Sequence, residues 1–367
     1  MPDAIVIGGG VMGLAMAREL RRRGHTVTLL ERAQPGRAAS WASAGIIGAT
    51  VREETDPSSE MRRVSEQLWP AFAEQLQAET GMDPEYRETG CLYLAETERE
   101  MSWLLRVAAR SAARPVKTEL LDQQQLRTVE PALAPSMCGA LRVPGGNVEP
   151  RRLCRALEIA ARRAGARIQS GVEVRAIVTA GDRVTGVATA DGEIPSDLVL
   201  MAAGAWSSTI EGLQQVPVHP QRGQILAIDQ SAVGIRHVLL TPDDPYFVPR
   251  CDGRLVIGAT REEAGWDASL TTGGVAWLLN RAMAVVPKLS ECPIGEMWTG
   301  FRPLSADGLP LIGAGLLRGL YLLTGHGPSG ISPLPGSVGL LSALIAGESP
   351  PLNPAPFDPL RFTRSER

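Results

Sequence analysis

The chain opens with Ala4-Ile-Val-Ile-Gly-Gly-Gly-Val-Met-Gly-Leu-Ala-Met-Ala17, and a second apolar run further on ends at Glu31. In the pattern Gly8-x-Gly10-x-x-Gly13, the first glycine permits a tight turn and the second lets the backbone approach a pyrophosphate. The third lets the following helix pack closely on the strand, with the helix N-terminus aimed at the phosphates. Glu31 is placed to bind ribose hydroxyls. The stretch therefore predicts a strand, a helix and a strand that bind the ADP part of FAD or NAD.

The segment after Glu31 bears on which of these two dinucleotides is bound. It reads Arg32-Ala-Gln-Pro-Gly-Arg-Ala-Ala-Ser-Trp-Ala-Ser-Ala-Gly-Ile-Ile-Gly48. An NAD domain would normally continue into another helix, whereas this small-residue loop suits close passage of the backbone along a long, extended ligand. The loop therefore favours FAD.

Three later stretches carry further motifs. They are Leu198-Val-Leu-Met-Ala-Ala-Gly-Ala-Trp-Ser207, Trp298-Thr-Gly-Phe-Arg-Pro-Leu-Ser-Ala-Asp-Gly-Leu-Pro-Leu-Ile-Gly313 and Leu320-Tyr-Leu-Leu-Thr-Gly-His-Gly-Pro-Ser-Gly-Ile-Ser332. Together with the two opening segments, these motifs resemble in kind and order those of the glycine oxidase and D-amino acid oxidase family of FAD-dependent enzymes. The glycine oxidase of thiamine biosynthesis is the most similar type. The resemblance is strongest over residues 4–48, 244–260 and 300–332 and weak over 50–140.

The resemblance implies an α/β fold in which a Rossmann-like FAD-binding domain is interleaved with a mixed-sheet, D-amino acid oxidase-like substrate-binding domain. We expect the FAD-binding domain in residues 1–50, 141–215 and 300–367 and the substrate-binding domain in residues 51–140 and 216–299. Apolar periodicity predicts helices over residues 60–80, 98–113, 151–164, 277–286 and 338–346. The pair Asp252-Gly253 predicts a tight hairpin turn. The proline-rich tail from Ser349 is expected to be a surface extension.

The same resemblance, carried over residue by residue, implies which residues bind FAD. Ala42 stands where related covalent flavoenzymes have a His after the Trp of this loop, so FAD is expected to be non-covalent. Val174 would contact the adenine end through its backbone. The full predicted set is Gly8, Gly10, Val11, Met12, Gly13, Glu31, Arg32, Ala39, Ser40, Ala44, Gly45, Ile46, Val174, Gly204, Trp206, His326, Gly327, Pro328, Ser329, Gly330, Ile331 and Ser332.

Two further residues are implied to bind the substrate, and we name them as the catalytic residues. Arg302, in the segment Gly-Phe-Arg-Pro, would form a bidentate pair with a substrate carboxylate, because a planar guanidinium offers parallel donors and stays charged. Tyr246 matches a family tyrosine whose hydroxyl also reaches the carboxylate.

The last loop departs from the glycine oxidases, which resemble each other in reading Gly-His-x-Arg-Asn-Gly-Ile there. Pro328 and Ser329 stand in place of the Arg and the Asn. The pocket thereby loses a positive charge and gains space, so we expect bulkier amino acids or secondary amines to be better substrates than glycine. If glycine were nevertheless the best substrate, another positive group would have taken over the lost role, and Arg222 and Arg250, from the covering sheet, are the candidates.

The implied reaction is oxidative deamination of a small amino acid or a related amine. The flavin N5 accepts a hydride from the carbon that bears the amine, while the protein supplies binding, orientation and electrostatics. Reoxidation by O2 would give H2O2. Two alternatives stay open: a dehydrogenase that passes electrons to a quinone or a protein partner, and a flavin-binding subunit of a larger complex. A plain NAD dehydrogenase fits less well, because both the loop after Glu31 and the last loop favour FAD.

Composition excludes several other classes of protein. The net charge of −3 gives no reason to expect a nucleic-acid partner. No apolar run approaches the roughly 20 residues that a membrane-spanning helix needs. Five scattered cysteines and four histidines without ligand spacing argue against a disulfide framework and against a metal site. We therefore expect a cytoplasmic enzyme with a small-molecule substrate, and a homo-oligomer stays open.

Overall fold

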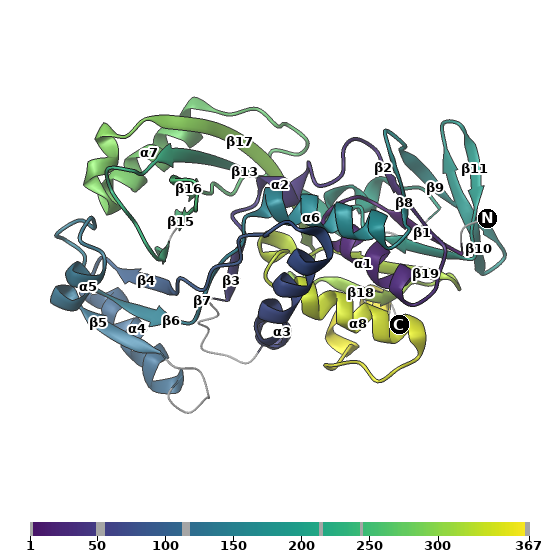
Figure 1. Cartoon of the computed structure of the whole chain (residues 1–367), viewed down its shortest axis with the longest axis horizontal. Helices are drawn as coiled ribbons and strands as arrows, with labels where there is room; N and C mark the ends of the chain where they lie inside the picture. Colours follow the sequence, from purple (N-terminus) through teal and green to yellow (C-terminus); the bar gives the residue numbers. More distant parts are fainter. Residues whose placement is uncertain (1–2, 49–55, 112–117, 213–215, 243–244, 364–367) are drawn as a thin grey trace.

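Two lobes lie side by side, each built around its own sheet (Figure 1). The structure is a computed structural model, and it describes residues 3–48, 56–111, 118–212, 216–242 and 245–363. Within these residues, one lobe holds a six-stranded sheet and the other an eight-stranded sheet, with two smaller sheets of three and two strands. The predicted α/β fold with a mixed sheet is confirmed.

The six-stranded sheet contains the predicted strand, helix and strand unit. Its order is β18-β19-β12-β1-β2-β8. Its strands are β1 (Ala4–Ile7), β2 (Val27–Glu31), β8 (Arg167–Ser170), β12 (Leu198–Met201), β18 (Leu311–Ala314) and β19 (Leu320–Thr324). All four residues of β1 are buried, as befits a central parallel strand. Because β1, β2, β12 and β19 run parallel, the motifs that follow them meet at one edge of the sheet.

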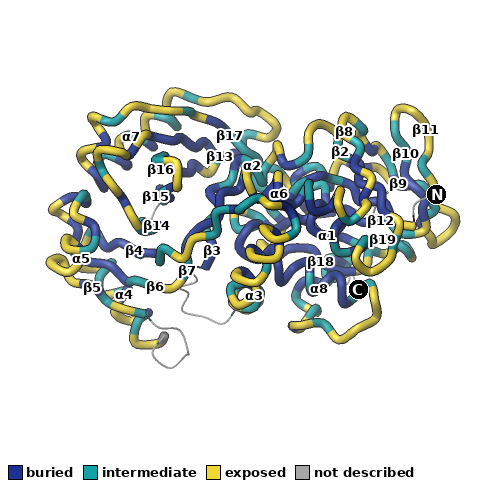
Figure 2. The backbone as a smooth tube through the Cα atoms, in the orientation of Figure 1, coloured by how far each residue is buried: buried dark blue, intermediate teal, exposed yellow. Residues whose placement is uncertain are grey.

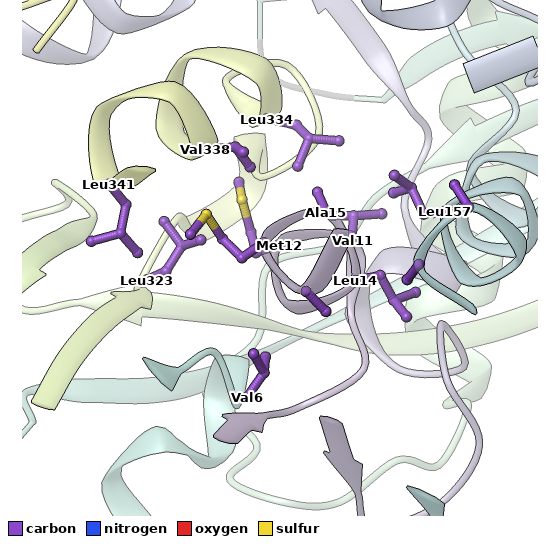
Figure 3. Packing of buried hydrophobic residues seen from close by; sticks show 14 of the residues in the cluster. Val6, Val11, Met12, Leu14, Ala15, Leu157, Leu323, Leu334, Val338 and Leu341 are labelled. Atoms are coloured by element: carbon purple, nitrogen blue, oxygen red, sulfur yellow. The ribbon is translucent and has the colours of Figure 1, made fainter. Parts of the chain in front are cut away.

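The helices of this lobe pack around the helix that follows the glycine motif (Figure 3). They are α1 (Val11–Arg22), α3 (Pro57–Thr80), α6 (Pro150–Arg163) and α8 (Leu334–Ala346). Helix α1 lies between α6 and α8, and Leu14, Leu157 and Leu341 are completely buried there. Burial of one leucine side chain contributes about 1.5–3 kcal/mol to folding. This core therefore fixes the glycine motif against the sheet.

Two small sheets extend the first lobe. β3 (Ile46–Gly48) pairs with β7 (Gly145–Asn147) between the two lobes (Figure 1). A three-stranded antiparallel sheet, formed by β9 (Val174–Ala180), β10 (Arg183–Thr189) and β11 (Gly192–Pro195), lies at the far end. Helix α3, although it falls in the expected substrate-binding domain, packs on α6 and α8 of this lobe. The domain boundaries themselves stay a prediction.

The eight-stranded sheet forms the second lobe. Its order is β17-β13-β16-β15-β14-β4-β6-β5, with a parallel pair of β14 and β4 among antiparallel neighbours. Its strands are β4 (Cys91–Ala95), β5 (Glu119–Asp122), β6 (Gly139–Val143), β13 (Val218–Asp229), β14 (Val238–Leu240), β15 (Tyr246–Pro249), β16 (Arg254–Gly258) and β17 (Ile294–Ser305). The predicted hairpin joins β15 to β16, and Gly253 adopts a positive φ of 87° in its turn.

The helices of the second lobe differ in part from the prediction. They are α4 (Glu98–Ser111), α5 (Gln123–Val129) and α7 (Thr272–Val285). The predicted end of α4 at residue 113 lies outside the described residues. Helix α7 begins before the predicted start at residue 277, because the Thr271 side chain caps Gly274. Helix α5 was missed because its capping box, Asp122 with Gln125, precedes a polar segment without an apolar stripe.

The proline-rich tail packs on the first lobe, so the prediction of a surface extension is wrong. Phe357 is 1% exposed and belongs to the same core as α8, and Arg361 pairs with Asp307. Five short 3-10 segments complete the described elements: η1 (Gly204–Thr209), η2 (Pro287–Glu291), η3 (Gly327–Ser329), η4 (Ala355–Phe357) and η5 (Pro359–Phe362). Figure 2 shows burial concentrated in the strands and in the centre of the first lobe. None of the described helices is both long and apolar enough to cross a bilayer.

Candidate active site

One cavity of about 540 Å³ is lined by residues from both lobes. This volume lies within the range of small-molecule and cofactor sites. At one end it is lined by the segments that follow β1, β2 and β12, and at the other by β13, β15 and β17. All predicted site residues line this cavity except Gly13.

The glycine motif is shaped as its sequence requires. Gly8 has a φ of +103°, and a Cβ atom there would collide with the carbonyl oxygen of Ala202. A Cβ atom at Gly10 would lie 3.2 Å from the Ser40 hydroxyl, in the space where the turn faces the cavity. Gly13 lies away from the cavity, where a Cβ atom would collide with the Gly8 carbonyl oxygen. The third glycine thus serves close packing of α1 on the sheet.

Glu31 lies at the carboxyl end of β2, beside the glycine turn. Its Oε2 accepts a hydrogen bond from the Gly9 amide at 2.7 Å, and its Oε1 accepts one from the Ala33 amide at 2.9 Å. Arg32 stacks on Trp206, with Cζ 3.6 Å from the ring centroid. A carboxylate beside a glycine-rich turn fits the ribose of a dinucleotide without a 2′-phosphate.

The predicted small-residue loop contains one helical turn, α2 (Ala39–Ala42), and the second lobe holds it in place. Trp298 Nε1 donates a hydrogen bond to the Ala42 carbonyl at 3.0 Å, and Arg250 Nη2 donates one to the Ala44 carbonyl at 2.7 Å. On β17, Gly300 faces this turn, and a Cβ atom there would lie 2.6 Å from the Cβ of Ala42. These contacts place the backbone of the loop along the cavity wall.

Arg250 forms an ion pair with Glu149 and does not line the cavity. Its side chain is 2% exposed, and its Nε lies 3.1 Å from Oε2 of Glu149. Burial lowers the pKa of Arg250, and the charge of Glu149 opposes that change. Arg222 likewise points away and pairs with Glu262 and Asp267. The conditional expectation that Arg222 or Arg250 takes over the charge lost at Pro328 is therefore wrong, because neither lines the cavity. Arg250 pairs with the buried Glu149, and Arg222 pairs with the partly exposed Glu262 and the exposed Asp267.

The last loop lines the cavity over its whole predicted length, from His326 to Ser332. His326 is buried, and burial lowers its pKa to about 3, so the imidazole is neutral at neutral pH. Its Nε2 lies 3.2 Å from the Ser337 hydroxyl. The Ser332 carbonyl accepts a hydrogen bond from Trp69 of α3 at 2.8 Å, which fixes the end of the loop.

Arg302 and Tyr246 line the end of the cavity formed by the eight-stranded sheet. Nη1 of Arg302 donates a hydrogen bond to the Thr260 carbonyl at 2.9 Å. A Cβ atom at Gly223 would lie 2.6 Å from Nη2 of Arg302, so a glycine is needed beneath the guanidinium. The Tyr246 hydroxyl lies over Gly258 in the same way, 2.8 Å from where a Cβ atom would be.

The sequence analysis missed a row of side chains that runs across the sheet. Leu240 pairs with Tyr93 on one side and Tyr246 on the other, and Gly258 continues the row to Ile225. Neighbouring side chains in one row share a face of the sheet. Tyr93, Leu240, Tyr246 and Ile225 all line the cavity, so this row is its wall. Only the strand register could have revealed it.

Charges are unevenly distributed along the lining. Arg62 and Arg261 line the cavity in addition to Arg302, and sequence reasoning had missed both. Among the described lining residues the acids are Glu31 and Glu173, which lie together because the Val172 amide bonds the Glu31 carbonyl. The end with Arg302 is therefore suited to an anionic group.

The sequence profile of the FAD dependent oxidoreductase family, DAO, matches residues 3–344. The chain belongs to this family. A glycine oxidase from Pseudomonas aeruginosa is 35% identical to it over 364 residues, covering 97% of this chain and 98% of the relative. The crystal structure of glycine oxidase from Geobacillus kaustophilus superposes with a TM-score of 0.93 at 32% identity and covers 98% of each chain.

A second solved structure with a similar fold is that of iminodiacetate oxidase from Chelativorans sp. BNC1. It superposes with a TM-score of 0.89 at 28% identity, covering 97% of this chain and 98% of that one. The predictions of a DAO-like fold, of FAD as cofactor and of an FAD-dependent amino acid oxidase of the glycine oxidase type are confirmed by these matches. The roles of individual residues stay predictions, which the shared cavity supports.

Proposed function

We propose that the protein oxidises an amino acid or an N-substituted amino acid whose carboxylate binds Arg302. The observation that carries this proposal is the position of Arg302, which lines the same cavity as the glycine turn and lies across Gly223. A guanidinium pairs with a carboxylate through two parallel charge-assisted bonds. The Tyr246 hydroxyl, in the cavity wall, is the second group assigned to the carboxylate.

FAD supplies the hydride acceptor when bound. The residues that would hold it are those of the glycine turn, the α2 loop and the last loop, with Glu31 at the ribose. Arg302 and Tyr246 would hold the carboxylate, so that the amine-bearing carbon points toward the part of the cavity lined by the glycine turn and the last loop, and the row through Leu240 would contact the substrate side chain. Among the described lining residues, His326 is a weak base because burial lowers its pKa to about 3, and Glu31 and Glu173 lie at the end with the glycine turn. We therefore propose that the amine binds in its neutral form.

Substrates larger than glycine are proposed on the strength of Pro328 and the apolar row. Pro328 lines the cavity where the glycine oxidases have an arginine in the motif. Leu240 and Ile225 add apolar surface beside Tyr246. The structurally similar iminodiacetate oxidase acts, by its name, on iminodiacetate, which is a secondary amine with two carboxylate arms. We propose N-substituted glycines and small apolar amino acids as the substrate class.

The electron acceptor is proposed to be O2, with H2O2 and an oxo acid as products after the imine hydrolyses. The alternatives of a dehydrogenase with a quinone or protein acceptor, and of a flavin subunit in a complex, stay open. The cytoplasmic location and a homo-oligomer likewise stay predictions.

The test is an anaerobic titration of the purified holoenzyme with glycine, alanine, sarcosine and N-ethylglycine, followed by mixing with air. We expect the flavin absorbance to bleach with at least one N-substituted or apolar compound, and H2O2 to form in equal amount on aeration. Bleaching without peroxide would favour the dehydrogenase. No bleaching with any of these compounds would contradict the proposed substrate class.

A further inference from the structure

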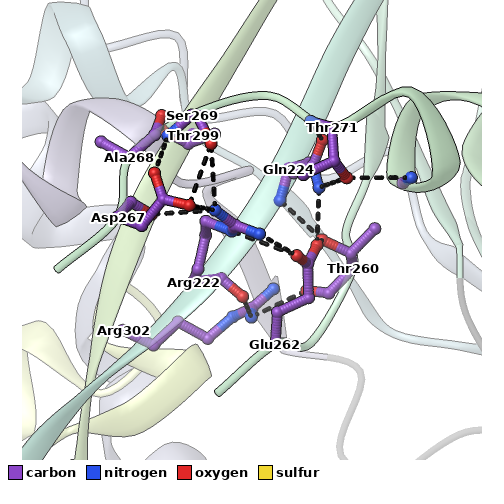
Figure 4. A network of polar contacts seen from close by, with 11 residues as sticks. Arg222, Gln224, Thr260, Glu262, Asp267, Ala268, Ser269, Thr271, Thr299 and Arg302 are labelled. Atoms are coloured by element: carbon purple, nitrogen blue, oxygen red, sulfur yellow. Dashed lines mark hydrogen bonds and ion pairs between the residues drawn. The ribbon is translucent and has the colours of Figure 1, made fainter. Parts of the chain in front are cut away.

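We infer that Glu262 is a positioning residue for substrate carboxylates, because it fixes Thr260, whose carbonyl oxygen orients Arg302. The inference rests on the proposed function, since it assigns the carboxylate to Arg302. Glu262 is not among the residues that line the cavity. It acts through a chain of hydrogen bonds that ends at the guanidinium of Arg302 (Figure 4).

The chain begins where Glu262 meets β13. Oε2 of Glu262 accepts hydrogen bonds from Arg222, one of them from Nε at 3.1 Å. Oε1 accepts one from Nε2 of Gln224 at 2.7 Å and one from the Thr260 hydroxyl. Both carboxylate oxygens are thus used. Glu262 therefore joins β13 to the segment that follows β16.

Thr260 is the link between this carboxylate and Arg302. Its hydroxyl donates to Glu262 and accepts from the Gln224 amide at 2.8 Å, so the side chain is held from two sides. Its carbonyl accepts Nη1 of Arg302 at 2.9 Å. Two further acceptors of the same Nη1, the Arg222 carbonyl and Oε1 of Gln221, are more distant, at 3.4 and 3.5 Å. The Thr260 carbonyl is therefore the acceptor that sets the plane of the guanidinium.

Charge and burial keep this arrangement fixed. Arg222 is only 5% exposed, and Nη1 also bonds Oδ2 of Asp267 at 2.8 Å. Burial acts to raise the pKa of Glu262, but hydrogen bonds from Thr260, Arg222 and Gln224 outweigh it and hold the pKa below its ordinary value. Glu262 is therefore ionised at neutral pH. Arg222 is buried while Glu262 is 25% exposed, so the contribution of this pair to the geometry of the site follows from the four hydrogen bonds to Glu262 rather than from burial of both charges.

The rest of the segment has an anchor of its own, so loss of Glu262 acts locally. Trp266 stacks on Trp206 with ring centroids 4.8 Å apart and meets Phe301 edge-on at 5.5 Å. These aromatic contacts do not pass through Glu262. Thr271 is held by Gln224, whose Oε1 accepts the Thr271 amide at 2.9 Å, and the Gln224 side chain also donates to Glu262. We therefore expect the cavity and the FAD site to survive its replacement.

The test measures acetate binding to the holoenzyme through the change in flavin absorbance, with acetate as the carboxylate probe. The variants are Glu262→Ala and Glu262→Gln. The matched control is Glu96→Gln, because Glu96 is also 25% exposed and pairs with Arg281 at 2.6 Å in the same lobe, away from Arg302. We expect Glu262→Ala to raise the Kd of acetate about tenfold, because a displaced Arg302 guanidinium keeps only part of its two charge-assisted bonds to the carboxylate. Glu262→Gln keeps an oxygen for Thr260 and should recover part of that loss.

Flavin content and the melting temperature report whether each variant is folded. Arg302→Lys must raise the Kd of acetate for the comparison to count. Given that, the inference is overturned if both Glu262 variants bind acetate with the same Kd as Glu96→Gln. If Arg302→Lys also leaves the Kd unchanged, or if acetate does not perturb the parent enzyme, the carboxylate site of the proposed function fails. If Glu262→Ala loses FAD and Glu262→Gln does not, the inference is judged on the acetate Kd of Glu262→Gln compared with that of Glu96→Gln.

Discussion

Arg250, on the strand-to-strand turn of the second lobe, donates a hydrogen bond through Nη2 to the Ala44 carbonyl at 2.7 Å. Nη1 of the same side chain bonds the Asn147 side chain and the Val148 carbonyl, and Glu149 neutralises its charge. One buried guanidinium thus ties the loop along the cofactor cavity to both β7 and β15. The backbone of the loop at the cavity wall is therefore held by Arg250, although Arg250 does not itself line the cavity.

Replacing Arg250 should therefore weaken FAD binding as well as stability. Arg250→Met removes the buried partner of Glu149 and leaves it only the more distant Arg254 at 3.4 Å, so we expect a destabilisation below the roughly 3–5 kcal/mol that a fully unpaired buried charge costs. We expect a lower melting temperature and faster loss of flavin on dilution, both measured by flavin fluorescence. Arg318→Met is the control, since Arg318 is 73% exposed in its pair with Asp182. Equal flavin retention in Arg250→Met and the parent would show that the Ala44 contact does not shape the site.

Gly10 should be needed for FAD and dispensable for folding. A side chain at residue 10 would enter the space between the glycine turn and Ser40. We expect Gly10→Val to purify colourless, with a circular dichroism spectrum like that of the parent. Gly273→Ala, where a Cβ atom meets no other atom within 4 Å, should remain yellow. Acid or heat should release the FAD of the parent, and colour that stays with the denatured chain would contradict non-covalent binding.

These predictions on the cofactor half follow from sequence because its motifs are local. Gly8, Gly10 and Glu31 lie within one strand, helix and strand unit, and parallel pairing brings the segments after β12 and β19 to the same edge. Through the family resemblance, short motifs are enough to predict that Trp206 and His326 lie at the cavity, which they line. Arg302 is predicted in the same way, from the residues beside it, and its role stays a prediction.

The substrate wall could not be predicted, because it depends on register between distant strands. Tyr93 and Ile225 reach the cavity through pairings that no local pattern encodes. The same limit explains the wrong expectation for Arg222 and Arg250. A sequence gives the charge of an arginine but not the carboxylate that binds it in the folded protein.

Acid should destabilise the native state through His326. Its folded pKa of about 3 lies below the ordinary value of 6.5, so the unfolded chain binds the extra proton between these values. Stability from this group is complete above about pH 6.5 and falls by about 1.4 kcal/mol per pH unit as the pH drops toward 3. We expect His326→Asn to lose less unfolding free energy than the parent between pH 7 and pH 5 in urea titrations. His219→Asn, at an exposed histidine, is the control and should follow the parent.

Glycine should be a poor substrate beside its larger relatives. Pro328 and the apolar row leave space that glycine does not fill, and a hydrophobic pocket gains about 1–3 kcal/mol per added methylene. We expect kcat/KM to rise from glycine to alanine and from glycine to sarcosine and N-ethylglycine, in a steady-state panel. A highest kcat/KM for glycine would contradict this account and would assign the missing positive charge to another lining residue, with Arg261 the first to test.

The most direct test of the central claim is the rate of anaerobic flavin reduction by the best substrate of that panel, in the parent and in Arg302→Lys. A lysine keeps the charge but cannot form the two-pronged contact. We predict a loss of about 2–5 kcal/mol in substrate binding, with FAD content unchanged, and a smaller loss near 1 kcal/mol for Tyr246→Phe. If Arg302→Lys has the substrate affinity and the flavin reduction rate of the parent, the substrate carboxylate binds elsewhere and the account is contradicted.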